Sequence, residues 1–321
     1  MTYLIGTDEA GYGPNLGPLV ISASLWHVPT AMRGDDLYAA LAGVVSRRAA
    51  ADSALCQVPM ADSKTLYKSS GGLQALECGV LTALRAIGWQ PADWREAWAA
   101  AAPHSLADLD GAPWYADFEL NLPLHHDGAD LDRLAAIFLR GLGDARVRLV
   151  HVRSMTVSPQ RFNDELDRWG NKATALSILT LDLIKTILPI EDGQDVFVSC
   201  DKHGGRQRYA EFLQKAFPEY LVEIFGECQS HSLYRWGPAK RRLEFCFLEK
   251  AERLLPVALA SMASKYLREL AMLAFNAFWR KHVPNLRPTA GYPEDARRFR
   301  QEIAACQQKL GIADRILWRN R

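Results

Sequence analysis

The sequence has 321 residues, of which 49% are apolar and 23% are charged, and its formal net charge at pH 7 is +1. This composition is that of a folded globular protein and excludes a disordered or collagen-like chain. Because the net charge is close to zero, any surface that binds nucleic acid must be a local patch. No apolar run approaches the ~20 residues of a membrane span.

The cysteines indicate the cellular compartment. Six of them are scattered without any Cys-x-x-Cys spacing, at Cys56, Cys78, Cys200, Cys228, Cys246 and Cys306. We expect reduced thiols in a cytoplasmic protein, with neither a disulfide framework nor a zinc site. The chain starts directly in an apolar run, so we expect no signal peptide. We also expect a monomer with no membrane partner.

The first residues contain the most informative pattern. Residues 3–7 predict a strand that ends in Asp8 and Glu9, and the chain then turns through the glycine-rich residues 11–14. Two carboxylates at the end of a buried strand are costly without a positive partner. Their hard oxygen atoms suit Mg²⁺ or Mn²⁺. A solvated acid pair in a glycine turn is the alternative that this stretch alone leaves open.

Apolar periodicity predicts the elements that follow. Helices are expected at residues 35–50, 72–88, 131–142, 159–169, 171–188, 207–217, 255–282 and 294–308, and strands at 17–26, 145–157, 195–200, 220–225 and 243–248. This order indicates an α/β fold in one domain over residues 1–321. Residues 61–66 are expected to form a polar loop.

Residues 89–144 differ from the rest in their tryptophans and alanine run, and we interpret them as an insertion with one or two helices. They include His125, His126 and Asp127, whose side chains could suggest a metal cluster. A surface loop is the better interpretation, because no other ligand follows at metal-site spacing.

Three predicted strands end in acids. Asp201 follows the strand at 195–200, and Glu249 or Glu252 follows the strand at 243–248, as Asp8 and Glu9 follow the first. Carboxylates that converge from strand ends suit a phosphodiester site with two metals about 3.5–4 Å apart.

In chain order, these residues resemble the ribonuclease HII family and its HIII relatives. The matching motifs are Asp8-Glu9-Ala10-Gly11-Tyr12-Gly13-Pro14 with Gly17-Pro18-Leu19-Val20, then Asp62-Ser63-Lys64, Gly170-Asn171-Lys172-Ala173-Thr174, Val198-Ser199-Cys200-Asp201, Ala260-Ser261-Met262-Ala263-Ser264-Lys265-Tyr266-Leu267-Arg268-Glu269, and Gly291-Tyr292. They cover nearly the whole chain outside residues 89–144. Each motif is short, but the ordered set is specific.

The resemblance implies a ribonuclease H-like fold, with a central mixed sheet flanked by helices, and endonucleolytic cleavage of the RNA strand of RNA–DNA hybrids with Mg²⁺ or Mn²⁺. The metal-binding and catalytic residues would be Asp8, Glu9, Asp201 and Glu252. The residues that bind substrate, an RNA–DNA hybrid or a ribonucleotide-containing duplex, would be Gly11, Tyr12, Gly13, Ser63, Lys64 and Tyr292. We place Lys202 with them, in a basic patch with Lys64, Arg206, Arg235, Lys240, Arg241 and Arg242.

The sequence departs from the family pattern at two positions. Glu252 stands where the family has an aspartate and is one residue closer to Lys265, so Glu269 stays open as the fourth acid. Tyr12 replaces an arginine between two glycines and loses its charge and rigid donors. We therefore expect weak cleavage at a single embedded ribonucleotide. Two alternatives follow, a nuclease with altered substrate preference and a catalytically inactive hybrid-binding protein.

Overall fold

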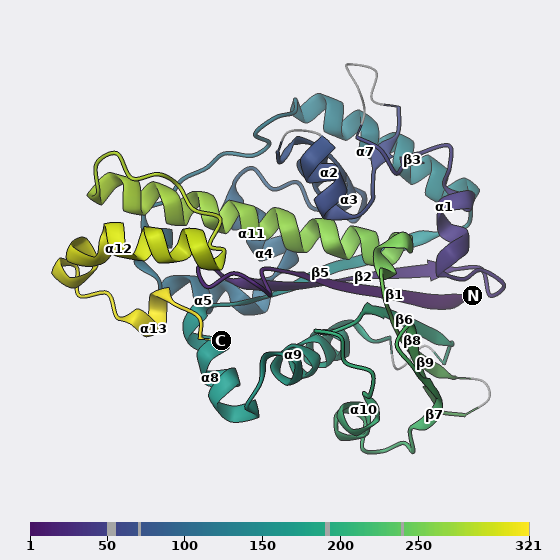
Figure 1. The fold of residues 1–321 in the computed structure, drawn as a ribbon. Coiled ribbons are helices and arrows are strands. Elements are labelled where there is room, and N and C mark those ends of the chain that lie inside the picture. The colour runs from purple at the N-terminus through teal and green to yellow at the C-terminus, as the bar shows by residue number, and fades with distance from the viewer. Residues whose placement is uncertain (50–55, 70–71, 190–192, 239–240, 321) are drawn as a thin grey trace.

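The computed structural model describes residues 1–49, 56–69, 72–189, 193–238 and 241–320. A seven-stranded mixed sheet, in the order β5-β2-β1-β6-β9-β8-β7, runs through the middle of the protein (Figure 1). Its strands are β1 (Thr2–Ala10), β2 (Leu19–Val28), β5 (Arg148–Val157), β6 (Val196–Asp201), β7 (Glu223–Glu227), β8 (His231–Trp236) and β9 (Leu243–Leu248). The expected α/β fold, with a central mixed sheet flanked by helices, is confirmed.

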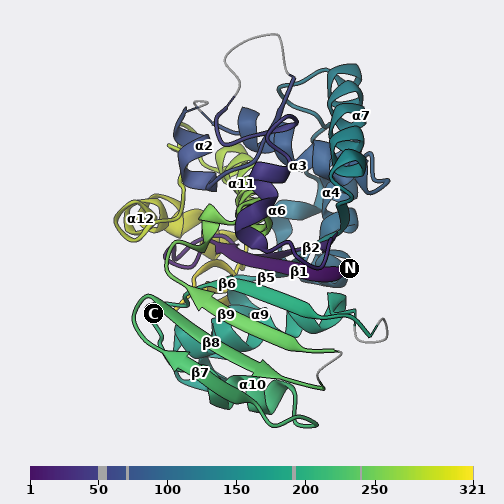
Figure 2. The same cartoon turned by 90° about the vertical axis from the view of Figure 1, so that its right-hand side faces the viewer.

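Helices cover both faces of this sheet (Figures 1 and 2). On one face the long helix α11 contacts β1 and β2, and on the other α9 contacts β2 and β5. The helices are α1 (Leu37–Ala40), α2 (Ser63–Ser69), α3 (Gln74–Ala86), α4 (Trp94–Ala101), α5 (Leu106–Asp110), α6 (Pro113–Ala116), α7 (Gly128–Asp144), α8 (Pro159–Trp169), α9 (Lys172–Ile187), α10 (Ala210–Ala216), α11 (Leu255–His282), α12 (Pro293–Lys309) and α13 (Asp314–Leu317).

The central strand β1 is buried on both sides. Leu4 packs into the core under α11, whereas Tyr3 and Ile5 point into the core under α9, as the two-residue period of a strand requires. Gly6 lets α11 begin directly against the strand, since a Cβ atom there would lie 2.2 Å from the carbonyl carbon of Pro256. The start of α11 and the end of β1 are therefore fixed together.

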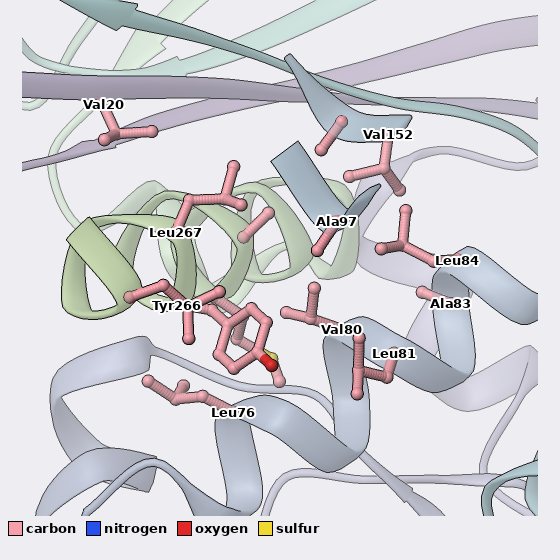
Figure 3. Close-up of a cluster of buried hydrophobic side chains, with 14 of the residues drawn as sticks. Val20, Leu76, Val80, Leu81, Ala83, Leu84, Ala97, Val152, Tyr266 and Leu267 are labelled. Atoms are coloured by element: carbon pink, nitrogen blue, oxygen red, sulfur yellow. The ribbon is translucent and has the colours of Figure 1, made fainter. Parts of the chain in front are cut away.

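The core between α11 and α3 is apolar and holds α11 in place. Tyr266 and Leu267 of α11 lie among Leu76 and Val80 of α3, with Val152 of β5 nearby (Figure 3). All five side chains are buried. Burying each such side chain contributes about 1.5–3 kcal/mol to folding.

Three local predictions are wrong. Residues 35–50 do not form one helix, because α1 stops at Ala40 and Val45–Ser46 form β3, which pairs with Val58–Pro59 as β4. Gly43 weakens a helix there by about 1 kcal/mol relative to alanine. The expected polar loop at 61–66 contains the start of α2 at Ser63, and β8 occupies a stretch for which no strand was predicted.

The segment 89–144 holds α4, α5, α6 and α7, more helices than expected. Trp94, Trp98 and Trp114 are buried, whereas Trp89 is exposed, and the ring of Trp114 lies 5.1 Å from that of Phe275 on α11. The segment therefore packs onto the long helix, and its status as an insertion stays a prediction. His125 and Asp127 lie exposed before α7, as expected for a surface loop.

In the part of the chain that the structure describes, no helix combines the length and the apolar character needed to cross a bilayer.

Candidate functional site

The sheet brings the predicted acids to one end. β1 and β6 are parallel, with Thr7 beside Cys200, so Asp8 follows on one strand where Asp201 follows on its neighbour. β9 lies parallel to β6 on its other side, and Glu252 lies in the short 3-10 turn Ala251–Arg253 just after β9. Three strand ends thus supply the carboxyl groups, as the sequence predicts.

Asp8 and Glu9 are held in an unfavourable electrostatic setting. Burial, with the charges of Asp201 and Glu252, raises the pKa of Asp8 to about 7, although a hydrogen bond from Ser261 opposes the rise. Burial and then the charge of Asp8 raise the pKa of Glu9 well above its usual range. For Glu9 the positive charge of Lys64 opposes this rise but does not outweigh burial and the neighbouring acids.

Asp201 and Glu252 share this setting. Burial raises the pKa of Asp201, although the Ala251 N–H donates to its Oδ1 at 3.1 Å and opposes the rise. Burial, and then the charges of Asp201 and Asp62, raise the pKa of Glu252. Four carboxyl groups thus act on one another within one neighbourhood.

Lys64 supplies positive charge to this group. It lies exposed in the first turn of α2, where the side chain of Asp62 accepts its backbone N–H at 3.1 Å. Burial lowers the pKa of Lys64, but the charges of Asp8, Asp62 and the other acids outweigh this effect and raise it. One ammonium does not offset this cluster, because the pKa of each of the four carboxyl groups stays raised beside it.

The donor set fits a divalent cation, because carboxylate oxygens are the ligands that Mg²⁺ and Mn²⁺ prefer. Within the described ranges, however, no three His, Cys, Asp or Glu side chains are arranged to hold an ion as they stand. That these four carboxyls together bind an ion stays a prediction.

Glu252 and Glu269, the two candidates for the fourth acid, differ in their surroundings. The charge of Glu252 acts on both Asp8 and Glu9. Glu269 instead accepts from Lys265 Nζ at 2.5 Å and lies 3.7 Å from Arg268 Nη1. Its carboxylate is therefore neutralised by neighbours on its own helix.

The two glycines of the loop between β1 and β2 differ, because Gly11 has no room for a side chain and Gly13 has free space around it. Gly11 has φ +90°, and a Cβ atom there would lie 2.5 Å from Arg268 Nε, so no side chain fits. Nothing lies within 4 Å of a Cβ built on Gly13, so the backbone there is open to a ligand.

Tyr12 lies half-buried between these glycines. A Cβ atom on Gly204 would lie 2.9 Å from its hydroxyl oxygen, which places the ring against the turn after β6. Burial and then the charge of Glu9 raise the pKa of Tyr12, and Arg206 opposes this. The phenol therefore stays neutral and next to the acids.

The other predicted substrate residues differ in accessibility. Ser63 is buried, with its hydroxyl hydrogen-bonded to that of Ser261 at 2.9 Å. Tyr292 is 55% exposed, and its loop is tied to the first one because Asn15 N–H donates to Gly291 O at 2.8 Å. Tyr292 is thus available for stacking, whereas Ser63 lies inside the protein and supports the site through its hydrogen bond to Ser261.

Lys202 is buried, and its ammonium donates to Cys228 O at 2.6 Å, Ser232 Oγ at 3.2 Å and Arg206 O at 3.4 Å. An ammonium has three N–H donors. Since protein oxygens already accept all three, this geometry gives Lys202 a structural role beside Asp201.

The predicted basic patch is divided. Arg241 and Arg242 precede β9, whose start at Leu243 pairs with Val196 at the beginning of β6. Leu243 lies about 16 Å along the strand from the Asp201 end, at about 3.3 Å per residue, and the two arginines come before it in the chain. The guanidinium of Arg235 is paired with Glu244 at 2.5 Å, and Lys240 lies outside the described residues. The expectation of one continuous patch is wrong.

Sequence reasoning assigned no role to two serines of α11 that support Asp8. Ser264 Oγ donates to Asp8 O at 3.0 Å, and Ser261 hydrogen-bonds the Asp8 side chain. Their spacing of three residues on the face of α11 toward β1 could have indicated this. Arg319, whose side chain reaches the Gly11 loop, lies in no motif and carried no such signal.

Comparison with known proteins gives structural similarity only. No family model matches the sequence, and no curated protein matches it. Among solved structures, the chain is similar to ribonuclease HII of Archaeoglobus fulgidus in its complex with PCNA, at 14% identity over 100% of this chain and 95% of that chain, with a TM-score of 0.42.

Two further solved structures show a similarity of the same order. They are ribonuclease H2 of Pyrococcus horikoshii OT3 (14% identity, 98% of this chain, 92% of that chain, TM-score 0.40) and Bst ribonuclease HIII in complex with Mn²⁺ (14% identity, 99% of this chain, 66% of that chain, TM-score 0.39). Because identities and TM-scores are this low, we assign the site from the side chains of this protein alone.

Proposed function

We propose that the protein is a metal-dependent endonuclease that cleaves the RNA strand of RNA–DNA hybrids. The observation that supports this best is the meeting of Asp8, Glu9, Asp201 and Glu252 at one end of the sheet, each with a raised pKa. Carboxyl groups whose pKa values are perturbed by burial and by one another are candidates for a functional site. The ordered sequence motifs supply the class of substrate.

These four residues would hold Mg²⁺ or Mn²⁺. When bound, such ions activate the attacking water and stabilise the leaving oxygen of a phosphodiester. The protein holds two of the carboxyls through fixed donors, since Ser261 hydrogen-bonds Asp8 and the Ala251 N–H hydrogen-bonds Asp201. These donors orient both side chains before a ligand arrives.

Other residues would bind the substrate. The exposed ammonium of Lys64 lies beside the acids, where it can pair with a phosphate of the cut strand. The open backbone at Gly13 permits close approach of a nucleotide. The exposed ring of Tyr292 offers a stacking surface for a sugar or base.

Altered substrate preference is the second candidate, and Tyr12 is the observation that favours it. The phenol ring packs against the turn at Gly204 and offers a hydroxyl in place of a charged fork of donors. A catalytically inactive binder fits less well. Four clustered, half-buried carboxyls that disfavour one another's charged form destabilise the fold and repel a polyanion, so they bring no benefit to a protein that only binds.

A cleavage assay tests this proposal. Purified protein would be incubated with Mg²⁺, Mn²⁺ or EDTA on labelled RNA–DNA hybrid, duplex RNA, duplex DNA, and duplex DNA with one ribonucleotide. We expect cuts in the RNA strand of the hybrid with either metal and none in EDTA. Absence of hybrid cleavage with both metals would contradict the proposal.

A further inference from the structure

The Gly11 loop, which carries Tyr12 and the open backbone at Gly13, is held by a residue far away in the sequence. Arg319 Nη2 donates to Gly11 O at 2.5 Å and also to Pro14 O. Both ends of the turn around Tyr12 are thus bound to one guanidinium group.

Backbone contacts fix Arg319 itself against the same loop. Arg319 N–H donates to Asn15 O at 2.8 Å, and Asn15 Nδ2 donates to Arg319 O at 2.9 Å. Leu16 and Trp318 form an antiparallel bridge beside them. The segment 318–320 therefore runs alongside residues 15–16, with the Arg319 side chain directed under the turn.

The guanidinium is costly where it lies. Arg319 is fully buried, and its Nε and Nη1 atoms have no hydrogen-bond partner among the described residues. Burial and the neighbouring charge of Arg268 lower the pKa of Arg319 to about 9. The guanidinium carbon lies 5.0 Å from the centre of the Phe162 ring, but no carboxylate in the described part of the chain pairs with it. A buried cation in such surroundings destabilises a fold, so net stabilisation of the fold is a poor explanation for this residue.

Arg268 binds further carbonyl groups next to the Gly11 loop. It is buried in α11 and donates to Leu16 O at 3.3 Å and Ala290 O at 3.0 Å. The two arginines thus bind four carbonyl groups of the two loops that carry Tyr12 and Tyr292. Carbonyl oxygens bound to guanidinium groups cannot turn outward, which fixes the direction of the peptide groups that face a ligand.

We propose that Arg319 is a positioning residue of the candidate active site, which fixes the backbone of residues 11–14 in the conformation that receives the nucleotide beside the cut. This inference rests on the proposed function. It predicts that loss of the guanidinium weakens substrate binding in protein that stays folded. The side chain of Arg319 touches the loop, so its effect on the substrate is indirect.

The chain offers a matched control for Arg319. Arg315 lies four residues earlier on α13, half-exposed, and pairs with Asp164 at 2.6 Å and Asp167 at 2.7 Å on α8. Its removal loosens the same segment without taking a contact from the Gly11 loop. The test therefore compares Arg319→Ala, Arg319→Lys and Arg315→Ala with the wild type.

We expect Arg319→Ala to raise KM on the hybrid at least roughly tenfold, with a smaller loss in kcat, because a misplaced binding loop affects binding first. Millimolar guanidinium should restore KM, whereas NaCl at equal ionic strength should not. Arg319→Lys keeps the charge but not the fork and should recover only part of the loss. Arg315→Ala should behave as the wild type.

Hydrogen exchange of the peptide covering residues 11–17 provides a readout that does not depend on cleavage. It should be faster in Arg319→Ala than in wild type and Arg315→Ala, and guanidinium should slow it again. If wild type cleaves no hybrid, the proposed function fails, and this exchange still decides the role of Arg319. Should Arg319→Ala not fold, Arg319→Lys is measured in its place.

Two results would overturn the inference. One is unchanged KM together with unchanged loop exchange in folded Arg319→Ala or, failing that, Arg319→Lys. The other is equal rescue by guanidinium and by NaCl, which would show a general ionic effect on a loosened protein.

Discussion

Carboxyl groups lie on both sides of α11, and their surroundings are opposite in character. On the side toward α3, the fully buried Glu77 accepts hydrogen bonds from Leu124 N–H at 2.8 Å, His125 N–H at 2.7 Å and Tyr266 Oη at 3.2 Å. On the side toward the sheet, Asp8 lies among other acids, and its pKa rises to about 7.

The difference shows that this fold can satisfy a buried carboxylate with its own donors. Glu77 is satisfied by hydrogen bonds and serves to hold residues 124–125 against α3 and α11. The acids at the sheet end keep raised pKa values despite their hydrogen-bond donors, such as Ser261 for Asp8 and the Ala251 N–H for Asp201, and despite the nearby ammonium of Lys64. Because clustered carboxyl groups disfavour one another's charged form, these acids are the ones that a bound cation would stabilise.

Removing one acid from each side separates the two roles. We expect Asp201→Asn to lower kcat on hybrid by on the order of 10³-fold, because a charge needed to hold the catalytic ion is lost. Glu77→Gln should leave kcat unchanged and cost about 1–3 kcal/mol of unfolding free energy, since a backbone N–H loses its acceptor. Steady-state kinetics and urea unfolding of both variants measure this. Wild-type turnover in Asp201→Asn would contradict the metal site.

The two lysines beside the acids offer a second separation. Lys64→Met should raise KM on hybrid roughly tenfold, because an exposed ammonium that pairs with phosphate is lost. Lys202→Met should instead cost about 1–3 kcal/mol of unfolding free energy, because the carbonyl of Cys228 loses its donor. KM titrations and denaturant midpoints distinguish the two. A larger rise in KM for Lys202→Met than for Lys64→Met would reverse the roles that the geometry gives them.

Tyr12 sharpens the account of specificity at the same site. Wild type should cleave DNA with one embedded ribonucleotide poorly relative to continuous hybrid, where many phosphate and 2′-OH contacts share the binding. Tyr12→Arg should shift the ratio of kcat/KM toward the single ribonucleotide roughly tenfold, since a hydrogen bond to a charged group contributes about 1.5 kcal/mol. An unchanged ratio, with wild type already preferring the single ribonucleotide, would make Tyr12 a neutral replacement.

The smallest expected effect is on stability. The pKa of Asp8 is raised to about 7 in the folded protein, so the folded state binds more protons than the unfolded state between about pH 4 and 7. Wild-type stability in EDTA should therefore fall as pH rises through this window. Asp8→Asn should be matched to wild type near pH 4 and melt roughly 2–4 °C higher near pH 7. Equal melting temperatures of wild type and Asp8→Asn at both pH values would contradict a raised pKa of Asp8.

Much of the site could be predicted because its signals are local. A strand that ends in acids, an Asn171 cap on α9 and a long apolar helix are each visible within about ten residues of sequence. The helix predicted at 171–188 is present, and Asn171 caps it, with its Oδ1 accepting Thr174 N–H at 2.9 Å. The parallel register that brings Asp8 near Asp201 follows from the order of strands and helices.

What could not be predicted depends on contacts between distant segments. β3 replaces the expected helix because Val45 pairs with Val58, which lies 13 positions later in the sequence. The predicted basic patch does not form because Arg241 and Arg242 precede β9, at the end of the sheet opposite to Asp201. Arg319 reaches Gly11 across 308 positions, and no periodicity or motif carries information at that distance.

The central claim is that the four carboxyl groups bind a divalent cation, and a calorimetric titration of the protein with Mn²⁺ tests it most directly. Wild type and Glu77→Gln should bind Mn²⁺ alike, because Glu77 lies on the other side of α11. Asp8→Asn and Asp201→Asn should bind it at least roughly tenfold more weakly, since each loses a ligand charge. Identical titration of all four proteins, or no binding to any of them, would contradict the claim.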